Sequence, residues 1–154
     1  ERMNVDRKEA KELIEGYFTT YPQIKEYMDK SIEIARNQGY VETIFQRKRY
    51  LPDINSRNAT VRGYAERNAI NAPIQGSAAD IIKVAMSRIH KQFESNNLKA
   101  KMILQVHDEL NFSVPKAEKA IVEEIVIREM ETAFAMQVPL KADCGWGKNW
   151  LEAH

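Results

Sequence analysis

Apolar residues recur at helical spacing in four long stretches of the chain. The first follows Asp6, an acceptor typical of a helix start, and the second begins at Pro22 and ends at Gly39, which is free to take the left-handed cap conformation. The other two are expected to begin at Pro73 and Pro115, because proline removes a backbone donor from a helix interior. A shorter helix is expected to end before Pro73.

β-branched and aromatic residues predict two hairpins and a last strand. The first hairpin is expected over 40–51 and the second over 101–114, where Leu110, Phe112 and Val114 alternate on one face. A final strand is expected over 138–144. This order of elements predicts an α+β fold in which long helices cover one face of an antiparallel sheet.

Composition indicates an ordinary globular protein but does not indicate what the protein binds. The 154 residues are 44% hydrophobic and 29% charged, an ordinary globular balance, and the net charge of +1 offers no overall attraction for nucleic acid. One cysteine, Cys144, and three histidines exclude a disulfide framework and a Cys/His zinc cluster, and favour a reduced, cytoplasmic setting. No apolar run is long enough for a membrane span, and the absence of a starting Met suggests a piece of a longer chain.

Three polar residues, His107, Asp108 and Glu109, lie between the strands of the second hairpin. Tight hairpin turns favour Asn-Gly or Asp-Gly, because their central residues need positive φ, so local structure does not explain His-Asp. Two acids at a rigid strand end suit a hard metal such as Mg²⁺. A solvated acidic turn is the alternative.

Arg67, Asn71 and Gln75 are spaced four and four, which places them on one face if the helix is continuous. All three side chains donate hydrogen bonds, and the DNA minor groove offers acceptors at either orientation of a base pair. A helix entry with ordinary capping residues is the alternative. A basic stretch with interleaved aromatic residues is a second candidate for a surface that binds nucleic acid. A solvated face without a ligand is the alternative. Its basic members are Arg47, Lys48, Arg49, Arg57, Arg62 and Arg67.

These residues resemble the family-A DNA polymerases. Residues 105–110 resemble the family's motif C, 66–83 resemble its long palm helix, and 147–154 resemble its carboxyl terminus. Residues 40–43 with 51–54 resemble its fingers hairpin, although Gln46 stands where the family usually has glycine. The resemblance implies an antiparallel palm sheet with long packing helices, and divides the chain into fingers residues 1–65 and palm residues 66–154.

The resemblance also implies roles for single residues. Asp108 would bind metal, Glu109 would be a neighbouring acid of lesser importance, and His107 would lie near the primer terminus. Arg67, Asn71 and Gln75 would contact primer-template DNA from the minor-groove side. The parent would be a bacterial, cytoplasmic DNA-directed DNA polymerase of replication and repair that uses deoxynucleoside triphosphates and two Mg²⁺ ions. A second catalytic aspartate and the nucleotide-binding helix would lie upstream of Glu1, so the piece alone is expected to be inactive.

Two other functions remain open at this level. The chain could be a non-catalytic nucleic-acid-binding module of polymerase ancestry, or a metal-dependent nuclease that uses Asp108 and Glu109. We also expect self-association, because the first two helices carry apolar residues without an obvious partner. These residues are Leu13, Ile14 and Phe18.

Overall fold

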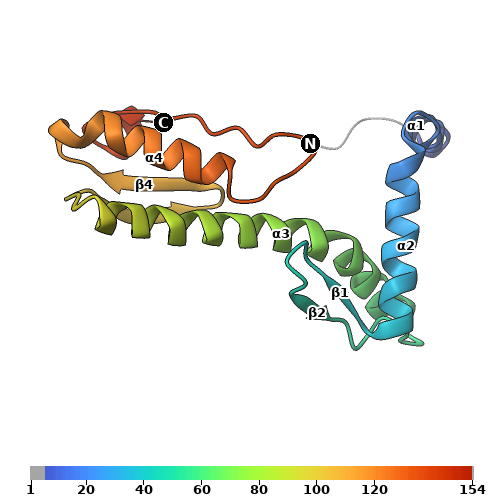
Figure 1. The fold of residues 1–154 in the computed structure, drawn as a ribbon. Helices are drawn as coiled ribbons and strands as arrows, with labels where there is room; N and C mark the ends of the chain where they lie inside the picture. Colours follow the sequence, from blue (N-terminus) through green and yellow to red (C-terminus); the bar gives the residue numbers. More distant parts are fainter. Residues whose placement is uncertain (1–5, 154) are drawn as a thin grey trace. The chain divides into compact units, whose positions relative to one another are not determined.

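The computed structural model describes residues 6–153 and divides into two compact units, Glu1–Gln75 and Gly76–His154. The amino-terminal unit begins with helices α1 (Arg7–Thr20) and α2 (Pro22–Gln38), both drawn in blue in Figure 1. The predicted start and stop signals are confirmed. Asp6 Oδ1 accepts hydrogen bonds of 2.8 Å from the backbone N–H groups of Lys8 and Glu9, and Gly39 ends α2 at φ 79°.

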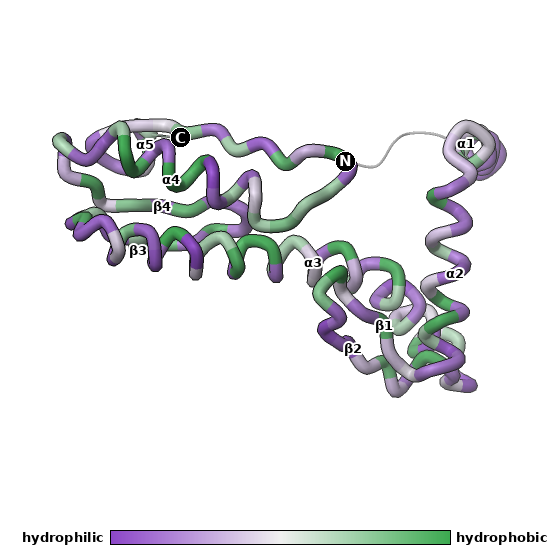
Figure 2. Tube along the Cα trace, viewed as in Figure 1, coloured by the Kyte–Doolittle hydropathy of each residue, from purple (hydrophilic) through white to green (hydrophobic). Residues whose placement is uncertain are grey.

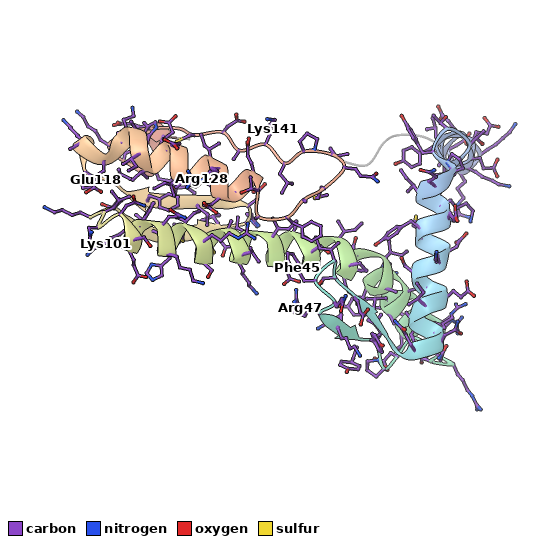
Figure 3. The ribbon with its side chains drawn as sticks, viewed as in Figure 1. Phe45, Arg47, Lys101, Glu118, Arg128 and Lys141 are labelled. Carbon is purple, nitrogen blue, oxygen red and sulfur yellow. The ribbon has the colours of Figure 1, made fainter. Side chains whose placement is uncertain are left out.

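The first predicted hairpin is confirmed as β1 (Tyr40–Glu42) and β2 (Lys48–Tyr50), which pair antiparallel. Thr43 organises the connection between them, because its buried hydroxyl accepts the backbone N–H groups of Phe45 at 3.3 Å and Arg47 at 3.2 Å. Figure 3 labels both of these residues. Gln46 lies between them at φ 62°, a left-handed conformation that disfavours a side chain.

A small apolar core holds the amino-terminal unit together. The hydroxyl of Tyr27 in α2 donates a 2.9 Å hydrogen bond to the carbonyl of Ile70, and Arg36 pairs with Glu66 at 2.6 Å. These contacts join α2 to helix α3 (Ala59–Ser95). The buried residues of this core are Ala35, Val41, Leu51, Ile54, Ala65 and Ala69.

Helix α3 is a correction to the sequence prediction, which placed a break before Pro73. The helix runs without interruption from Ala59 to Ser95 with Pro73 inside it. Proline cannot donate to the carbonyl of Ala69, one turn earlier, so the helix loses one backbone hydrogen bond there. Packing outweighs this loss, because Ala69 itself is fully buried in the core of the amino-terminal unit. Green and purple residues alternate along α3 in Figure 2, as expected for a helix with one packed side.

The carboxyl-terminal unit contains the second hairpin, β3 (Lys101–Val106) and β4 (Glu109–Ser113), and helix α4 (Lys119–Glu131). In Figure 1 this hairpin, α4 and the later part of α3 run alongside one another. The predicted inward face of β4 is confirmed, because Leu110, Phe112 and Val114 pack against the core. The buried members of that core are Ala85, Ile89, Phe93, Ala100, Val122, Ile125 and Ala133.

Strand β3 carries a β-bulge that the sequence did not reveal. Met102 pairs with Phe112 and Leu104 pairs with Asn111, so Ile103 is the extra residue and has no partner across the ladder. Its side chain is 64% exposed. The short 3-10 helix η1 (Lys116–Glu118) follows β4 and precedes α4.

The predicted strand over 138–144 is wrong, since these residues are irregular. A strand needs the free edge of a sheet, where its backbone groups can form hydrogen bonds. This segment instead forms hydrogen bonds with side chains of α4. Glu131 accepts the backbone N–H of Ala142 at 3.2 Å, and Trp146 Nε1 donates to Glu123 at 3.0 Å. The chain then forms the short helix α5 (Trp150–Ala153).

The small antiparallel sheets among long helices confirm the predicted α+β class. No helix within residues 6–153 combines the length and apolar character that a membrane span requires.

Candidate functional site

The acidic turn lies between two paired strands. Val106 of β3 pairs with Glu109 of β4, which leaves only His107 and Asp108 to reverse the chain. His107 has φ 54°, so the backbone here is left-handed without a glycine. Such a residue stores roughly 1–2 kcal/mol of strain, and strain of this kind gathers at functional sites. Gln105 supports the turn by donating from Nε2 to the His107 carbonyl at 3.0 Å.

Glu109 is held by two donors from different parts of the carboxyl-terminal unit. Its Oε1 accepts the indole N–H of Trp150 at 2.7 Å and the amide of Asn111 at 3.1 Å. Sequence reasoning missed both partners. The period of a strand could have indicated Asn111, which follows Glu109 by two positions and shares its face. No local pattern indicates Trp150, because it lies at the far end of the chain.

Asp108 is exposed at the apex of the same turn. A carboxylate on a rigid hairpin is the hard oxygen ligand that Mg²⁺ prefers, usually with one or two carboxylates and substrate phosphates. Within residues 6–153, no group of three or more His, Cys, Asp or Glu side chains is placed to hold a metal ion. The turn therefore supplies oxygen ligands that fit one part of a metal site.

Arg67, Asn71 and Gln75 all lie on α3 and all are exposed. Because the helix is continuous through Pro73, the spacing of four places them along one face of it. The guanidinium of Arg67 lies 5.9 Å from the ring of Tyr64, which is 65% exposed. This row of donors belongs to the amino-terminal unit and the acidic turn to the carboxyl-terminal unit.

The basic stretch is only partly available to a polyanion. The side chain of Arg62 is engaged within the amino-terminal unit, because Nη1 donates to the Ser56 carbonyl at 2.9 Å and Nε lies 3.7 Å from Glu66. Lys48 stacks on the ring of Tyr40 at 4.3 Å, and a hydrogen bond with that side chain raises the pKa of Lys48. Lys48 therefore remains a cation at neutral pH, beside an aromatic surface.

A helix-rich α+β segment with an acidic hairpin turn and a row of exposed donors falls in the class of polymerase domains. The POL domain of Pol1 from M. smegmatis, solved in complex with DNA primer-template and dNTP, shares this fold with a TM-score of 0.94. The two chains are 42% identical, and the match covers 97% of this chain and 26% of that chain. The chain belongs to DNA polymerase family A, whose sequence profile matches residues 1–152.

Curated relatives agree with this membership. DNA polymerase I of Caldicellulosiruptor bescii is 55% identical over 97% of this chain, and DNA polymerase I of Bacillus subtilis is 46% identical over 99% of it. The matched region makes up 18% of the first relative and 17% of the second. The chain therefore spans less than a fifth of the length of these relatives.

Proposed function

We propose that the chain is the carboxyl-terminal part of a DNA-directed DNA polymerase that extends a primer on a DNA template in bacterial replication and repair. Membership of family A and the shared fold support this proposal. The observation that carries it is the turn, in which a strained His107 directly precedes the exposed Asp108. The polymerase would act in the bacterial cytoplasm.

The proposed reaction is attack of the primer 3′ hydroxyl on the α-phosphorus of a deoxynucleoside triphosphate, with pyrophosphate as leaving group. Two Mg²⁺ ions, when bound, stabilise the charge on the attacking and leaving oxygens. Asp108 would hold these ions together with a carboxylate supplied by the rest of the polymerase. Glu109 would be the neighbouring acid, and His107 would lie beside the primer terminus.

Arg67, Asn71 and Gln75 would contact primer-template DNA through the minor groove. Purine N3 and pyrimidine O2 accept hydrogen bonds at comparable positions in every base pair, so donors there grip DNA of any sequence. A polymerase needs this kind of contact because it must copy every sequence. The exposed, aligned positions of these residues on α3 support the assignment.

We assign residues 1–65 to the fingers subdomain and 66–154 to the palm. The isolated chain is expected not to extend a primer, because the described residues offer only part of a metal site. Self-association belongs to the same proposal, since the apolar side chains of Leu13 and Ile14 on α1 are 54% and 56% exposed and Phe18 lies beside them.

The proposal is tested by Asp108→Asn in the complete polymerase. We expect primer extension in Mg²⁺ to fall by about 10²–10³-fold or more, because a preorganised charge at the reacting phosphate is lost. Affinity for primer-template DNA should stay within several-fold, since it depends mainly on phosphate and groove contacts. A filter-binding assay beside the extension assay separates the two effects.

Asp143→Asn is the matched control, because Asp143 is also an exposed carboxylate of the carboxyl-terminal unit. It should extend primers like the wild type. If Asp108→Asn also extends primers normally, Asp108 has no part in the reaction and the proposed function fails.

A further inference from the structure

Two hydrogen-bond donors converge on one oxygen of the Glu109 carboxylate. The indole N–H of Trp150 lies 2.7 Å from Oε1, and Asn111 Nδ2 lies 3.1 Å from the same atom. An indole nitrogen can only donate, so the direction of the first bond is fixed. A donor on an ionised carboxylate makes a bond about twice as strong as one between neutral groups. Glu109 is therefore held in one orientation.

The segment that carries Trp150 is itself fixed. Asn149 Oδ1 accepts the backbone N–H of Glu152 at 3.0 Å, and the Glu152 carboxylate accepts the backbone N–H of Lys148 at 2.9 Å. This reciprocal pair closes the first turn of α5. Gly147 permits the close approach, because a Cβ there would lie 2.5 Å from the Glu152 side chain. Trp150 thus reaches the hairpin from a rigid support, although it is 48% exposed.

We propose that Trp150 is a positioning residue, whose indole N–H holds the Glu109 carboxylate on the hairpin so that Asp108 is the acid of this turn presented to divalent metal. The inference rests on the proposed function, because the role of Asp108 is assigned there. Asp108 lies in the turn just before β4 and is exposed, so a Glu109 carboxylate tied to Trp150 and Asn111 leaves Asp108 as the acid that is free to meet a ligand from solvent. The last helix of the chain is then a support for the metal-binding turn.

The hydrogen bond itself is tested by NMR on the ¹⁵N-labelled 154-residue chain. The chain has two tryptophans and therefore two indole N–H resonances. We expect Glu109→Ala to move the Trp150 resonance upfield, because a hydrogen bond to a carboxylate is lost. Glu123→Ala is the matched control and should move only the resonance of Trp146, which donates to Glu123 at 3.0 Å. An unmoved Trp150 resonance in Glu109→Ala overturns the inference.

The positioning role is tested by a double-mutant cycle in the complete polymerase. We expect Trp150→Phe to raise the Mg²⁺ concentration for half-maximal extension by about tenfold, the lower end of the effect of losing an outer hydrogen bond that orders a metal site. In the Glu109→Ala background, Trp150→Phe should add nothing, because its effect passes through Glu109. Additive effects of the two substitutions overturn the inference.

Two controls separate loss of positioning from loss of fold. Trp146→Phe removes an indole of the same segment that bonds a different acid, and should leave the Mg²⁺ requirement unchanged. A Trp146 resonance at its wild-type position in Trp150→Phe shows that the end of the chain keeps its fold. Normal extension by Asp108→Asn would defeat the proposed function, whereas an additive cycle beside an inactive Asp108→Asn defeats only the role of Trp150.

Discussion

At the scale of single residues, two left-handed positions have different meanings. His107 has φ 54° in a turn whose side chains carry the proposed chemistry, whereas Gln46 has φ 62° in a connection that Thr43 organises through its hydroxyl. The sequence indicated both, because His-Asp is a poor tight turn and the family resemblance predicts glycine at the position of Gln46. Of these two residues, Gln46 lies outside the proposed site, so its backbone strain can be relieved by substitution without changing a residue proposed to take part in the reaction.

We expect Gln46→Gly to stabilise the amino-terminal unit by up to about 1 kcal/mol. Relief of roughly 1–2 kcal/mol of left-handed strain exceeds the entropy cost of glycine, about 0.5–1 kcal/mol. Urea unfolding of the 154-residue chain measures the change. Asn97→Gly is the control at φ 52°, and it should gain less because asparagine tolerates this conformation. A lower midpoint for Gln46→Gly would contradict the expectation.

At the scale of elements, local signals predicted helix ends better than helix continuity. Asp6 and Gly39 act through hydrogen bonds and φ values within one turn, so the sequence predicts them well. Pro73 and the segment 138–144 were mispredicted because their outcome depends on packing. The burial of Ala69 keeps α3 continuous through the proline, and Glu131 of α4 accepts a backbone N–H that a strand partner would otherwise bond.

Glu118 is a contact between elements that single-sequence reasoning also missed. Its carboxylate accepts the backbone N–H of Lys99 at 3.0 Å and of Ala100 at 2.9 Å, at the approach to β3. Figure 3 labels Glu118 beside Lys101, the first residue of that strand. The Glu118 side chain thus accepts hydrogen bonds from two backbone N–H groups, those of Lys99 and Ala100, which precede the paired residues of β3.

We expect Glu118→Ala to destabilise the carboxyl-terminal unit by about 1–3 kcal/mol, because backbone donors lose a charged acceptor. Glu118→Gln should cost less, since its amide oxygen still accepts. Thermal unfolding of the two variants measures the difference. Equal melting temperatures for wild type and Glu118→Ala would show that water replaces the carboxylate fully.

At the scale of the whole molecule, the sequence predicted the class of fold and the candidate residues but not their coupling. The acidic turn and the row on α3 are visible as spacings. The bond between Trp150 and Glu109 joins residues 41 positions apart, and no periodic pattern extends that far. In the structure, the row of donors on α3 belongs to the amino-terminal unit and the acidic turn belongs to the carboxyl-terminal unit. A sequence motif alone does not show this division.

The exposed apolar face of α1 leads to a prediction about association. We expect the 154-residue chain to form dimers or larger species at high concentration, because helix α1 has no buried residue and exposes Leu13 and Ile14. Sedimentation velocity measures the species present. Replacing both residues by glutamate should return the chain to monomer, whereas Lys8→Glu, a polar change on the same helix, should not. A monomer at every concentration contradicts this prediction.

The β-bulge at Ile103 limits how this segment can vary in length. Met102 pairs with Phe112 and Gln105 pairs with Leu110, and Ile103 is the surplus residue between these two pairs. Deleting Ile103 would leave Met102 opposite Phe112 and Leu104 opposite Asn111, so the ladder would become regular and lose the local bend and added twist that a bulge gives a strand. Loss of Ile103 would thereby redirect the acidic turn without changing a cross-strand pair.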